Sequence, residues 1–195
     1  MADAPRSFLF LLGSARDGGN TETLARAAAE HLEPSDTQRW IHLGQLGLPP
    51  FHDVRHSGDG VTPFAEGPQK IVQEATLAAT DVVIASPLYW YSVSATVKTY
   101  LDYWSGWLRV PGLDFKARMK GRRMWGVTVQ GDDEPDVSEP LVGTLRLTAV
   151  YMKMDWAGVL VGTGSRPGDV LRDESALAAA KTLFDPNIAT SGIRR

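Results

Sequence analysis

The sequence contains no cysteine among its 195 residues. Disulfide bonds, thiolate nucleophiles, iron–sulfur clusters and cysteine-ligated zinc are all excluded, because each of them needs a cysteine sulfur. Chemistry that depends on a thiolate ligand or a thiolate nucleophile is therefore not open to this protein.

The chain also lacks a long apolar run and an excess of positive charge. Its longest apolar run is too short to span a membrane, and the residues before Ser7 form no basic leader. Twenty Lys and Arg residues against 23 Asp and Glu residues give a formal net charge of −3. This balance argues against a nucleic-acid-binding surface or a polybasic membrane contact. We therefore expect a cytoplasmic protein that binds neither nucleic acid nor membranes.

Short apolar segments alternate with amphipathic segments along the chain. The pattern predicts strands over residues 8–12, 38–43, 81–86, 124–130 and 156–161. It predicts helices that begin near Asn20, Pro68, Ser94, Ser138 and Asp173. This alternation indicates an α/β protein with a flavodoxin-like, doubly wound, five-stranded parallel sheet of order 2-1-3-4-5 and helices on both faces. We expect one domain over residues 1–195, with a flexible C-terminal tail over 186–195.

The loop after the first predicted strand has the composition of an anion site. Ligands of open α/β sheets bind beyond the carboxyl ends of the strands, here between strands one and three. Residues 13–21 are rich in glycine and open a helix, so their backbone N–H groups and the helix dipole favour a phosphate. Side-chain donors come from Ser14, Arg16, Asn20 and Thr21. The loop matches neither the Walker A nor the dinucleotide fingerprint, and an ordinary turn with a solvated arginine remains the alternative.

Three consecutive aromatic residues, Tyr89, Trp90 and Tyr91, follow the third predicted strand. A flat heteroaromatic ligand would be held at such a place by rings and backbone amides. The alternative is that these rings belong to the core or to an interface. Together with the phosphate loop, they describe a ligand with a phosphate at one end and a flat ring at the other, which is the shape of flavin mononucleotide (FMN).

No catalytic constellation of side chains stands out elsewhere. The four histidines lie outside the predicted cleft loops, and the carboxylates at 132–134 and the histidines at 52 and 56 are typical of solvated loops. We expect no metal site. A bound cofactor is therefore expected to carry the chemistry.

Two motifs at these strand ends resemble a known family. Residues 13–25 read G-S-x-R-x-x-G-N-T-x-x-L-A, and residues 86–102 read S-P-x-Y-x-x-S-x-S-A-x-x-K-x-x-x-D. With a weaker Pro167-Gly168-Asp169, they resemble the FMN loops of the NADPH-dependent FMN reductase family and its iron–sulfur flavoprotein relatives. The resemblance implies a flavodoxin-like fold, noncovalent FMN, and two-electron transfer from NAD(P)H to a small-molecule acceptor such as a flavin or a quinone.

The same resemblance assigns roles by position. It implies that the FMN phosphate is held by Ser14, Arg16, Asn20 and Thr21. It implies that the isoalloxazine ring is lined by Pro87, Leu88, Tyr89 and Trp90, and that its pyrimidine edge is approached by Gly131 and Asp132. No side chain is expected to act as an essential general acid.

One departure from the family narrows the interpretation. The iron–sulfur relatives carry cluster cysteines between the second strand and the second helix, where residues 44–67 of this chain have none. This favours a plain FMN reductase or a quinone-reductase-like enzyme. Two alternatives remain open: an FMN electron carrier that does not turn over NAD(P)H, and a non-flavin phospho-ligand binder on the same fold. An electron carrier would be expected to be more acidic than −3.

Large apolar residues gather around the third predicted helix and the long connection after it. The connections 44–67 and 106–121 exceed simple turns, and structureless stretches of this length are usually functional or disordered. We expect a homodimer or homotetramer interface from the side chains of Trp90, Tyr100, Tyr103, Trp104, Trp107 and Leu108. The alternative is that these rings pack within one chain, beneath residues 106–121.

Overall fold

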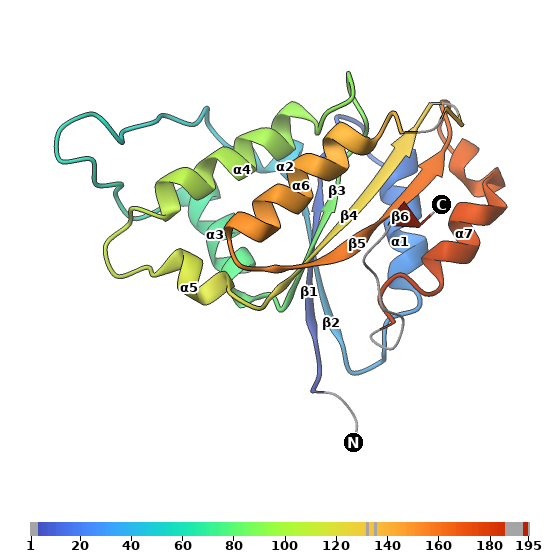
Figure 1. The fold of residues 1–195 in the computed structure, drawn as a ribbon, viewed down its shortest axis with the longest axis horizontal. Helices are drawn as coiled ribbons and strands as arrows, with labels where there is room; N and C mark the ends of the chain where they lie inside the picture. Colours follow the sequence, from blue (N-terminus) through green and yellow to red (C-terminus); the bar gives the residue numbers. More distant parts are fainter. Residues whose placement is uncertain (1–3, 132, 135, 186–192, 195) are drawn as a thin grey trace.

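The computed structural model describes residues 4–131, 133–134, 136–185 and 193–194. Its centre is a parallel β-sheet with the strand order β2-β1-β3-β4-β5-β6 (Figure 1). The strands are β1 (Ser7–Leu12), β2 (Thr37–His42), β3 (Asp81–Ala85), β4 (Arg123–Gln130), β5 (Asp155–Thr163) and β6 (Ile193–Arg194). The expected order 2-1-3-4-5 is confirmed, and a two-residue strand extends it beside β5.

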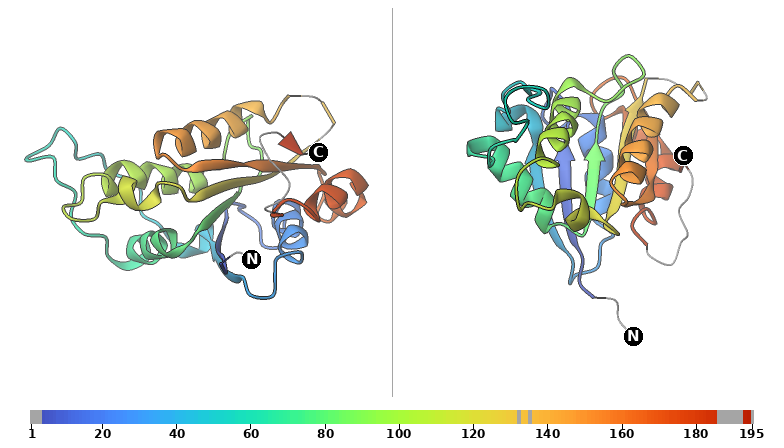
Figure 2. Two further views of the ribbon diagram at one scale, coloured as in Figure 1. Left: turned by 60° about the horizontal axis from the view of Figure 1, so that its bottom comes forward. Right: turned by 60° about the vertical axis from the view of Figure 1, so that its left-hand side comes forward.

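Helices cover both faces of this sheet (Figures 1 and 2). One face carries α1 (Asn20–Ala29) and α7 (Glu174–Ala180), which follows a short 3₁₀ helix η1 (Asp169–Arg172). The opposite face carries α3 (Gly67–Ala78), α4 (Ala95–Trp107), α5 (Phe115–Met119) and α6 (Glu139–Tyr151), with the short α2 (Leu43–Leu46) beside α4. No helix among the described residues has the length and apolar character needed to cross a membrane.

The alternation of side chains along β1 explains why the sheet has a core on each face. Phe8, Phe10 and Leu12 pack toward α1 and α7, whereas Leu9 and Leu11 pack toward α3 and α4. All five side chains are buried, as expected for a central parallel strand covered by helices on both sides. The continuous apolar run that predicted this strand is therefore a direct consequence of its position.

The two long connections are less irregular than expected. The connection 44–67 begins within α2, and the connection 106–121 contains α5. The packing of α3 departs from a simple apolar pattern, because Ile71 is exposed while Thr76 is buried. Thr76 avoids an unpaired hydroxyl because it donates to the Val72 carbonyl at 2.7 Å and shares a hydrogen bond with the Tyr100 hydroxyl at 2.8 Å.

The aromatic cluster on α4 is part of the core and is not a free surface. Trp104 and Trp107 are only 3% and 2% exposed, and Tyr100 and Tyr103 are buried beside them. Both tryptophan rings make edge-to-face contacts with Phe115 of α5, at centroid distances of 5.3 and 5.2 Å. The expectation that these rings form an oligomer interface is therefore wrong, because Phe115 covers both tryptophans and Phe51 packs on Tyr103 within one chain.

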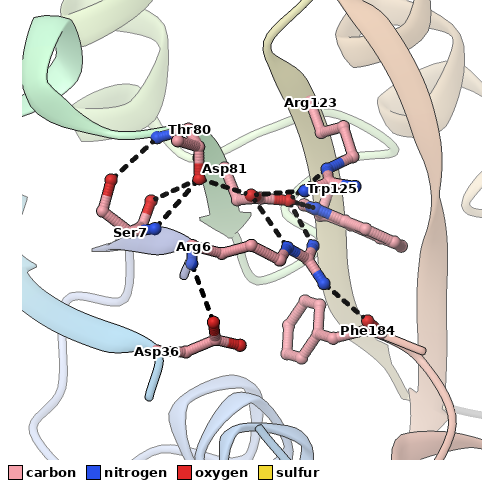
Figure 3. Close-up of polar contacts among 8 residues, drawn as sticks. All are labelled: Arg6, Ser7, Asp36, Thr80, Asp81, Arg123, Trp125 and Phe184. Carbon is pink, nitrogen blue, oxygen red and sulfur yellow. Dashed lines mark hydrogen bonds and ion pairs between the residues drawn. The ribbon is translucent and has the colours of Figure 1, made fainter. Parts of the chain in front are cut away.

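The amino end of the sheet is closed by a buried carboxylate (Figure 3). Asp81, the first residue of β3, forms ion pairs with Arg6 and Arg123, and accepts a hydrogen bond from the Trp125 indole at 2.8 Å. Burial alone would raise the pKa of Asp81, but the hydrogen bonds from Arg6, Trp125 and Arg123 hold it below its ordinary value. This network joins three adjacent strands at the end opposite to the carboxyl-end loops.

Of the expected C-terminal tail, residues 186–192 and 195 lie outside the described residues. Ile193 and Arg194, the remaining pair that the structure places, run parallel to Val159 and Leu160 of β5. These two residues pair with β5, whereas a flexible tail was expected there.

Candidate functional site

The first and second loops of the predicted site meet directly at the carboxyl ends of β1 and β3. The backbone N–H of Gly13 donates to the Ala85 carbonyl at 2.8 Å, and the Thr96 hydroxyl donates to the Gly13 carbonyl at 3.1 Å. A Cβ atom at Gly13 would lie 2.3 Å from Val97 Cγ2, so only glycine permits this approach of β1 to the start of α4. The structure thus brings residues 13–21 and 86–94 together at one edge.

The N-terminus of α1 is open to an anion. Gly19 occupies the N-cap position and has no side chain, so it caps none of the first-turn N–H groups. The Ser14 hydroxyl lies inside the loop, where it accepts a hydrogen bond from the Arg16 backbone N–H at 3.0 Å. Arg16 is exposed at the rim of the loop and brings a positive charge to the positive end of the helix dipole. Uncapped donors and a cation in one turn fit a phosphate group.

Side chains from two other elements brace this loop. Asp17 accepts a hydrogen bond from Gln45 of α2 at 2.7 Å, and His42 Nε2 at the end of β2 lies 3.3 Å from the same carboxylate oxygen. On the other side, the Gly18 N–H donates to Glu22 at 3.0 Å, and Glu22 pairs with Arg26. The sequence offers no spacing that would pair Asp17 with Gln45, so these supporting residues were missed.

Asn20 connects the phosphate loop to the loop after β5. Its amide nitrogen donates to the Arg166 carbonyl at 2.8 Å, and its amide oxygen accepts from the Gly168 N–H at 2.8 Å. The carboxylate of the nearby Asp169 accepts a hydrogen bond from the Arg166 N–H. This hydrogen bond lowers the pKa of Asp169, because its effect outweighs that of burial, which would raise it. The weaker Pro167-Gly168-Asp169 motif therefore lies next to the first loop. The direct phosphate contact expected of Asn20 stays a prediction.

The aromatic residues of the second loop form a tight turn that projects into solvent. Tyr89 and Ser92 exchange two backbone hydrogen bonds, each of 3.1 Å, around Trp90 and Tyr91. Both central residues have positive φ values, 50° and 64°, which is the geometry of a type I′ turn and is rare for aromatic side chains. Trp90 is 93% exposed, and Tyr89 and Tyr91 are also exposed. Such unfavourable backbone geometry is typical of functional sites.

Ser86 and Ser94 hold the base of that turn. Ser86 lies directly after β3, and its hydroxyl accepts a hydrogen bond from the Ser94 N–H at 2.9 Å. Ser94 caps α4, since its hydroxyl accepts from the Val97 N–H. Residues 87–93 therefore form a loop whose two ends are held together by hydrogen bonds, so the exposed rings project from a fixed base.

The third loop follows β4, the neighbour of β3, and contacts the loop after β5. The Gly164 N–H donates to the Gln130 carbonyl at 2.9 Å, and the Thr163 hydroxyl donates to Asp133 at 2.8 Å. A Cβ atom at Gly131 would meet no atom within 4 Å, so there is open space beside this residue. Asp132, the other residue expected at the pyrimidine edge, lies outside the described residues.

This arrangement of an uncapped helix N-terminus, an exposed aromatic turn and an open glycine at the carboxyl edge of a parallel sheet defines a flavodoxin-like nucleotide-binding protein. Residues 7–136 match the model of the family described as NADPH-dependent FMN reductase. The chain belongs to this family, which confirms the expected class of enzyme: an FMN-dependent oxidoreductase that uses NAD(P)H.

Individual relatives agree with this assignment. A Bacillus subtilis (strain 168) protein named as an NAD(P)H-dependent FMN-containing oxidoreductase, YwqN, is 34% identical over 173 residues, which cover 88% of this chain and 93% of that protein. The structure of a Trp repressor binding protein from Bacillus subtilis superposes with a TM-score of 0.72 at 27% identity, covering 93% of this chain and 99% of that one.

A more distant structure shares the fold. The NAD(P)H:quinone oxidoreductase from Methanothermobacter marburgensis superposes with a TM-score of 0.63 at 15% identity, covering 93% of this chain and 97% of that one. This likeness confirms the flavodoxin-like architecture.

Proposed function

We propose that this chain passes two electrons from NAD(P)H to a small-molecule acceptor through FMN bound at the carboxyl edge of β1, β3 and β4. The observation that carries the proposal is the contact of two loops with complementary chemistry. An open helix N-terminus with Arg16 suits a phosphate, and the rings of the 89–91 turn suit a flat heteroaromatic group.

In this proposal the phosphate is held by the first turn of α1, with donors from Ser14, Arg16, Asn20 and Thr21. The Ser14 hydroxyl accepts from the Arg16 N–H, so its own proton stays free to be donated to a phosphate oxygen. Asn20 uses its amide group on the loop after β5, so its contribution would come from its backbone N–H at the start of α1. Arg16 would supply the one positive side chain of the loop.

The flavin ring would lie against the second and third loops. Pro87, Leu88, Tyr89 and Trp90 would line it on one side. Gly131 would let the backbone come close to the pyrimidine edge, with Asp132 next to it. Within the turn, the Tyr89 N–H is used by the Ser92 carbonyl, so the neighbouring backbone N–H groups are the ones left to donate to the ring.

Bound FMN supplies the redox chemistry, because its ring system can accept a hydride and return two electrons. The chain itself binds and orients. Its backbone N–H groups would favour negative charge on the flavin, and the side chains of Trp90 and Tyr91, now exposed, would shield the flavin from water. This division of work needs no side-chain general acid.

We infer that the acceptor is a small flavin, quinone or similar compound that takes the place vacated by the oxidised nicotinamide. The open, aromatic setting of the 89–91 turn supports this, since it offers stacking surfaces without charge selection. The NAD(P)H:quinone oxidoreductase named above shares this fold, and its name gives a quinone as the acceptor. A cytoplasmic location is part of the same proposal.

We further propose that the working unit is a homodimer or homotetramer. The support comes from exposed apolar side chains away from the α4 core: Trp90 on the turn, and Leu147, Val150 and Tyr151 on α6. Surfaces of this kind usually meet a partner. Light scattering of the FMN-loaded protein would test this, and a monomer of 21.2 kDa with full activity would contradict it.

A binding experiment tests the flavin assignment directly. Apo-protein is titrated with FMN, riboflavin and FAD while protein or flavin fluorescence is followed. FMN should bind most tightly, and riboflavin should bind weakly because it lacks the phosphate that the α1 terminus would hold. Equal affinity for FMN and riboflavin would contradict the proposed phosphate site.

A further inference from the structure

A cavity lies away from the carboxyl-edge loops, between α3, α5 and the end of the connection 44–67. Its volume is about 530 Å³, within the range of small-molecule sites. Arg118 of α5 forms part of its wall, and α3 contributes Lys70, Gln73, Glu74, Leu77 and Ala78. Ala78, the last residue of α3, lines the cavity and precedes β3, so this wall lies toward the amino end of the sheet. Figure 1 shows α3 and α5 on the opposite side from the carboxyl ends of the strands.

The segment around α5 concentrates positive charge in a chain whose net charge is −3. Five of the eight residues over 116–123 are cationic: Lys116, Arg118, Lys120, Arg122 and Arg123. Three of these have structural partners. Lys116 lies 3.9 Å from the centre of the Tyr151 ring, Arg122 donates to the Ala79 carbonyl, and Arg123 pairs with Asp81.

Arg118 is the cation of this segment that faces the cavity. Within the described part of the chain, no carboxylate lies at ion-pair distance from its guanidinium. The positive charge of Arg118 also affects Arg122. Burial lowers the pKa of Arg122, and repulsion from Arg118 lowers this pKa further. A bound anion would relieve this repulsion.

The other lining residues define the rest of the ligand. Lys70 adds a second cation, and its Nζ lies 3.8 Å from a carboxylate oxygen of Glu74. The charges of Arg118, Lys70 and Glu74 therefore sum to one positive charge. Phe64 lines the cavity with a ring that is 69% exposed, and Leu77 and Leu113 add apolar surface. Gln73 lines the inner wall at 6% exposure, and its amide nitrogen has no hydrogen-bond acceptor among the described residues.

We propose that this cavity is a second small-molecule site, which binds an organic anion with one phosphate or carboxylate group and one flat ring. The anionic group would contact Arg118, with Lys70 beside it, and the ring would stack against Phe64. The proposal does not depend on the flavin site. Exposed charge on a flat surface would bind such anions weakly, whereas here cation, ring and cavity occur together.

The test uses FMN-loaded protein, so that the phosphate site at α1 is already filled. Phenyl phosphate and inorganic phosphate are titrated separately, and backbone amide NMR shifts are followed. Phenyl phosphate should bind saturably, perturb residues of α3 and α5, and bind about tenfold more tightly than inorganic phosphate, since burying one ring is worth roughly 1.4 kcal/mol or more.

Three variants locate the contact. Arg118→Gln should weaken phenyl phosphate binding about tenfold, because it removes a charged hydrogen bond. Lys120→Gln is the matched control, since it removes the same charge from an exposed neighbour that does not line the cavity. It should change affinity less than about twofold, the scale of an exposed charge effect. Phe64→Ala should abolish the preference for phenyl phosphate over inorganic phosphate.

Several outcomes would overturn the proposal. Binding still unsaturated at about 10 mM would place the affinity below that of a specific site. Equal losses in Arg118→Gln and Lys120→Gln would show general charge attraction. Shifts confined to residues 13–21 or 86–94 would show binding at the flavin site instead.

Discussion

The side-chain oxygen of Asn20 accepts a hydrogen bond from the backbone N–H of Gly168 at 2.8 Å, across 148 positions of the chain. The amide nitrogen of the same side chain donates to the Arg166 carbonyl at 2.8 Å. One amide group therefore ties the start of α1 to the loop after β5. The position of the proposed phosphate loop depends on this bridge.

Replacing Asn20 should weaken FMN binding with little loss of global stability. Asn20→Ala removes both hydrogen bonds and should cost about 1–2 kcal/mol of FMN binding free energy. Asn20→Asp keeps the acceptor for Gly168 but adds negative charge near the phosphate, so its loss should be larger. Fluorescence titration and thermal unfolding measure the two effects separately.

Gln38→Ala is the matched control for Asn20. Its amide also donates to a backbone carbonyl, that of Ala29 at 3.4 Å, but at the opposite end of α1. It should leave FMN affinity unchanged. An equal loss in both variants would mean that α1 as a whole, and not the bridge to Gly168, determines affinity.

Arg16 should contribute to FMN binding through the phosphate alone. Arg16→Ala should cost about 1.5–3 kcal/mol of FMN binding free energy, the range for hydrogen bonds to charged groups. Riboflavin affinity should not change, because riboflavin has no phosphate. Arg39→Ala, which removes an exposed arginine from β2, should leave both affinities unchanged. Unaltered FMN affinity in Arg16→Ala would remove Arg16 from the site.

The Asp81 network should set the acid limit of stability. The pKa of Asp81 is lower in the folded protein than in the unfolded chain, because Arg6, Trp125 and Arg123 outweigh the effect of burial. The stabilisation is therefore complete above the unfolded pKa, about 3.9, and is lost as pH falls through the lower folded pKa. Unfolding free energy should accordingly fall steeply below about pH 4.

Asp81→Asn should destabilise the fold by about 3–5 kcal/mol at neutral pH, because it leaves buried arginine charge unpaired. It should also flatten the dependence of stability on pH in the acid range. Asp102→Asn is the control, since Asp102 pairs with Lys98 on the exposed side of α4. Chemical unfolding at several pH values decides, and an unchanged acid dependence in Asp81→Asn would contradict this account.

The turn at Trp90 and Tyr91 should lower the stability of the fold while its aromatic side chains support turnover. A Trp90→Asn, Tyr91→Gly double variant carries the residues that a type I′ turn prefers, so its unfolding free energy should rise by about 1 kcal/mol. Its turnover of NAD(P)H with aromatic acceptors should fall, because the exposed rings are gone. A variant that is less stable, or one with full turnover, would refute this interpretation.

The core of the fold could be predicted because buried parallel strands are continuous apolar runs. The segment 8–12 is covered by helices on both faces, so its sequence needs no alternation. The position of the three loops then follows from topology, since all parallel strands end at one edge. The residue assignments within those loops stay predictions.

Long-range pairing could not be predicted in the same way. Nothing in the local sequence connects Asn20 with Gly168, or Asp17 with Gln45, because each pair forms only when separate loops fold together. The burial of Trp104 and Trp107, which was the alternative to an interface, could not be decided from the sequence for the same reason. A helix shows its apolar face in its sequence, but whether residues of its own chain cover that face depends on where Phe115 comes to lie.

Anaerobic stopped-flow reduction of the FMN-loaded protein tests the central proposal most directly. Mixing with NADPH or NADH should bleach the flavin absorbance near 450 nm in a saturable step without a long-lived one-electron species, and a quinone added afterwards should restore the absorbance. If neither nucleotide bleaches the bound flavin at about millimolar concentration, above the usual range of KM values, the chain is an electron carrier and the proposed NAD(P)H turnover is wrong.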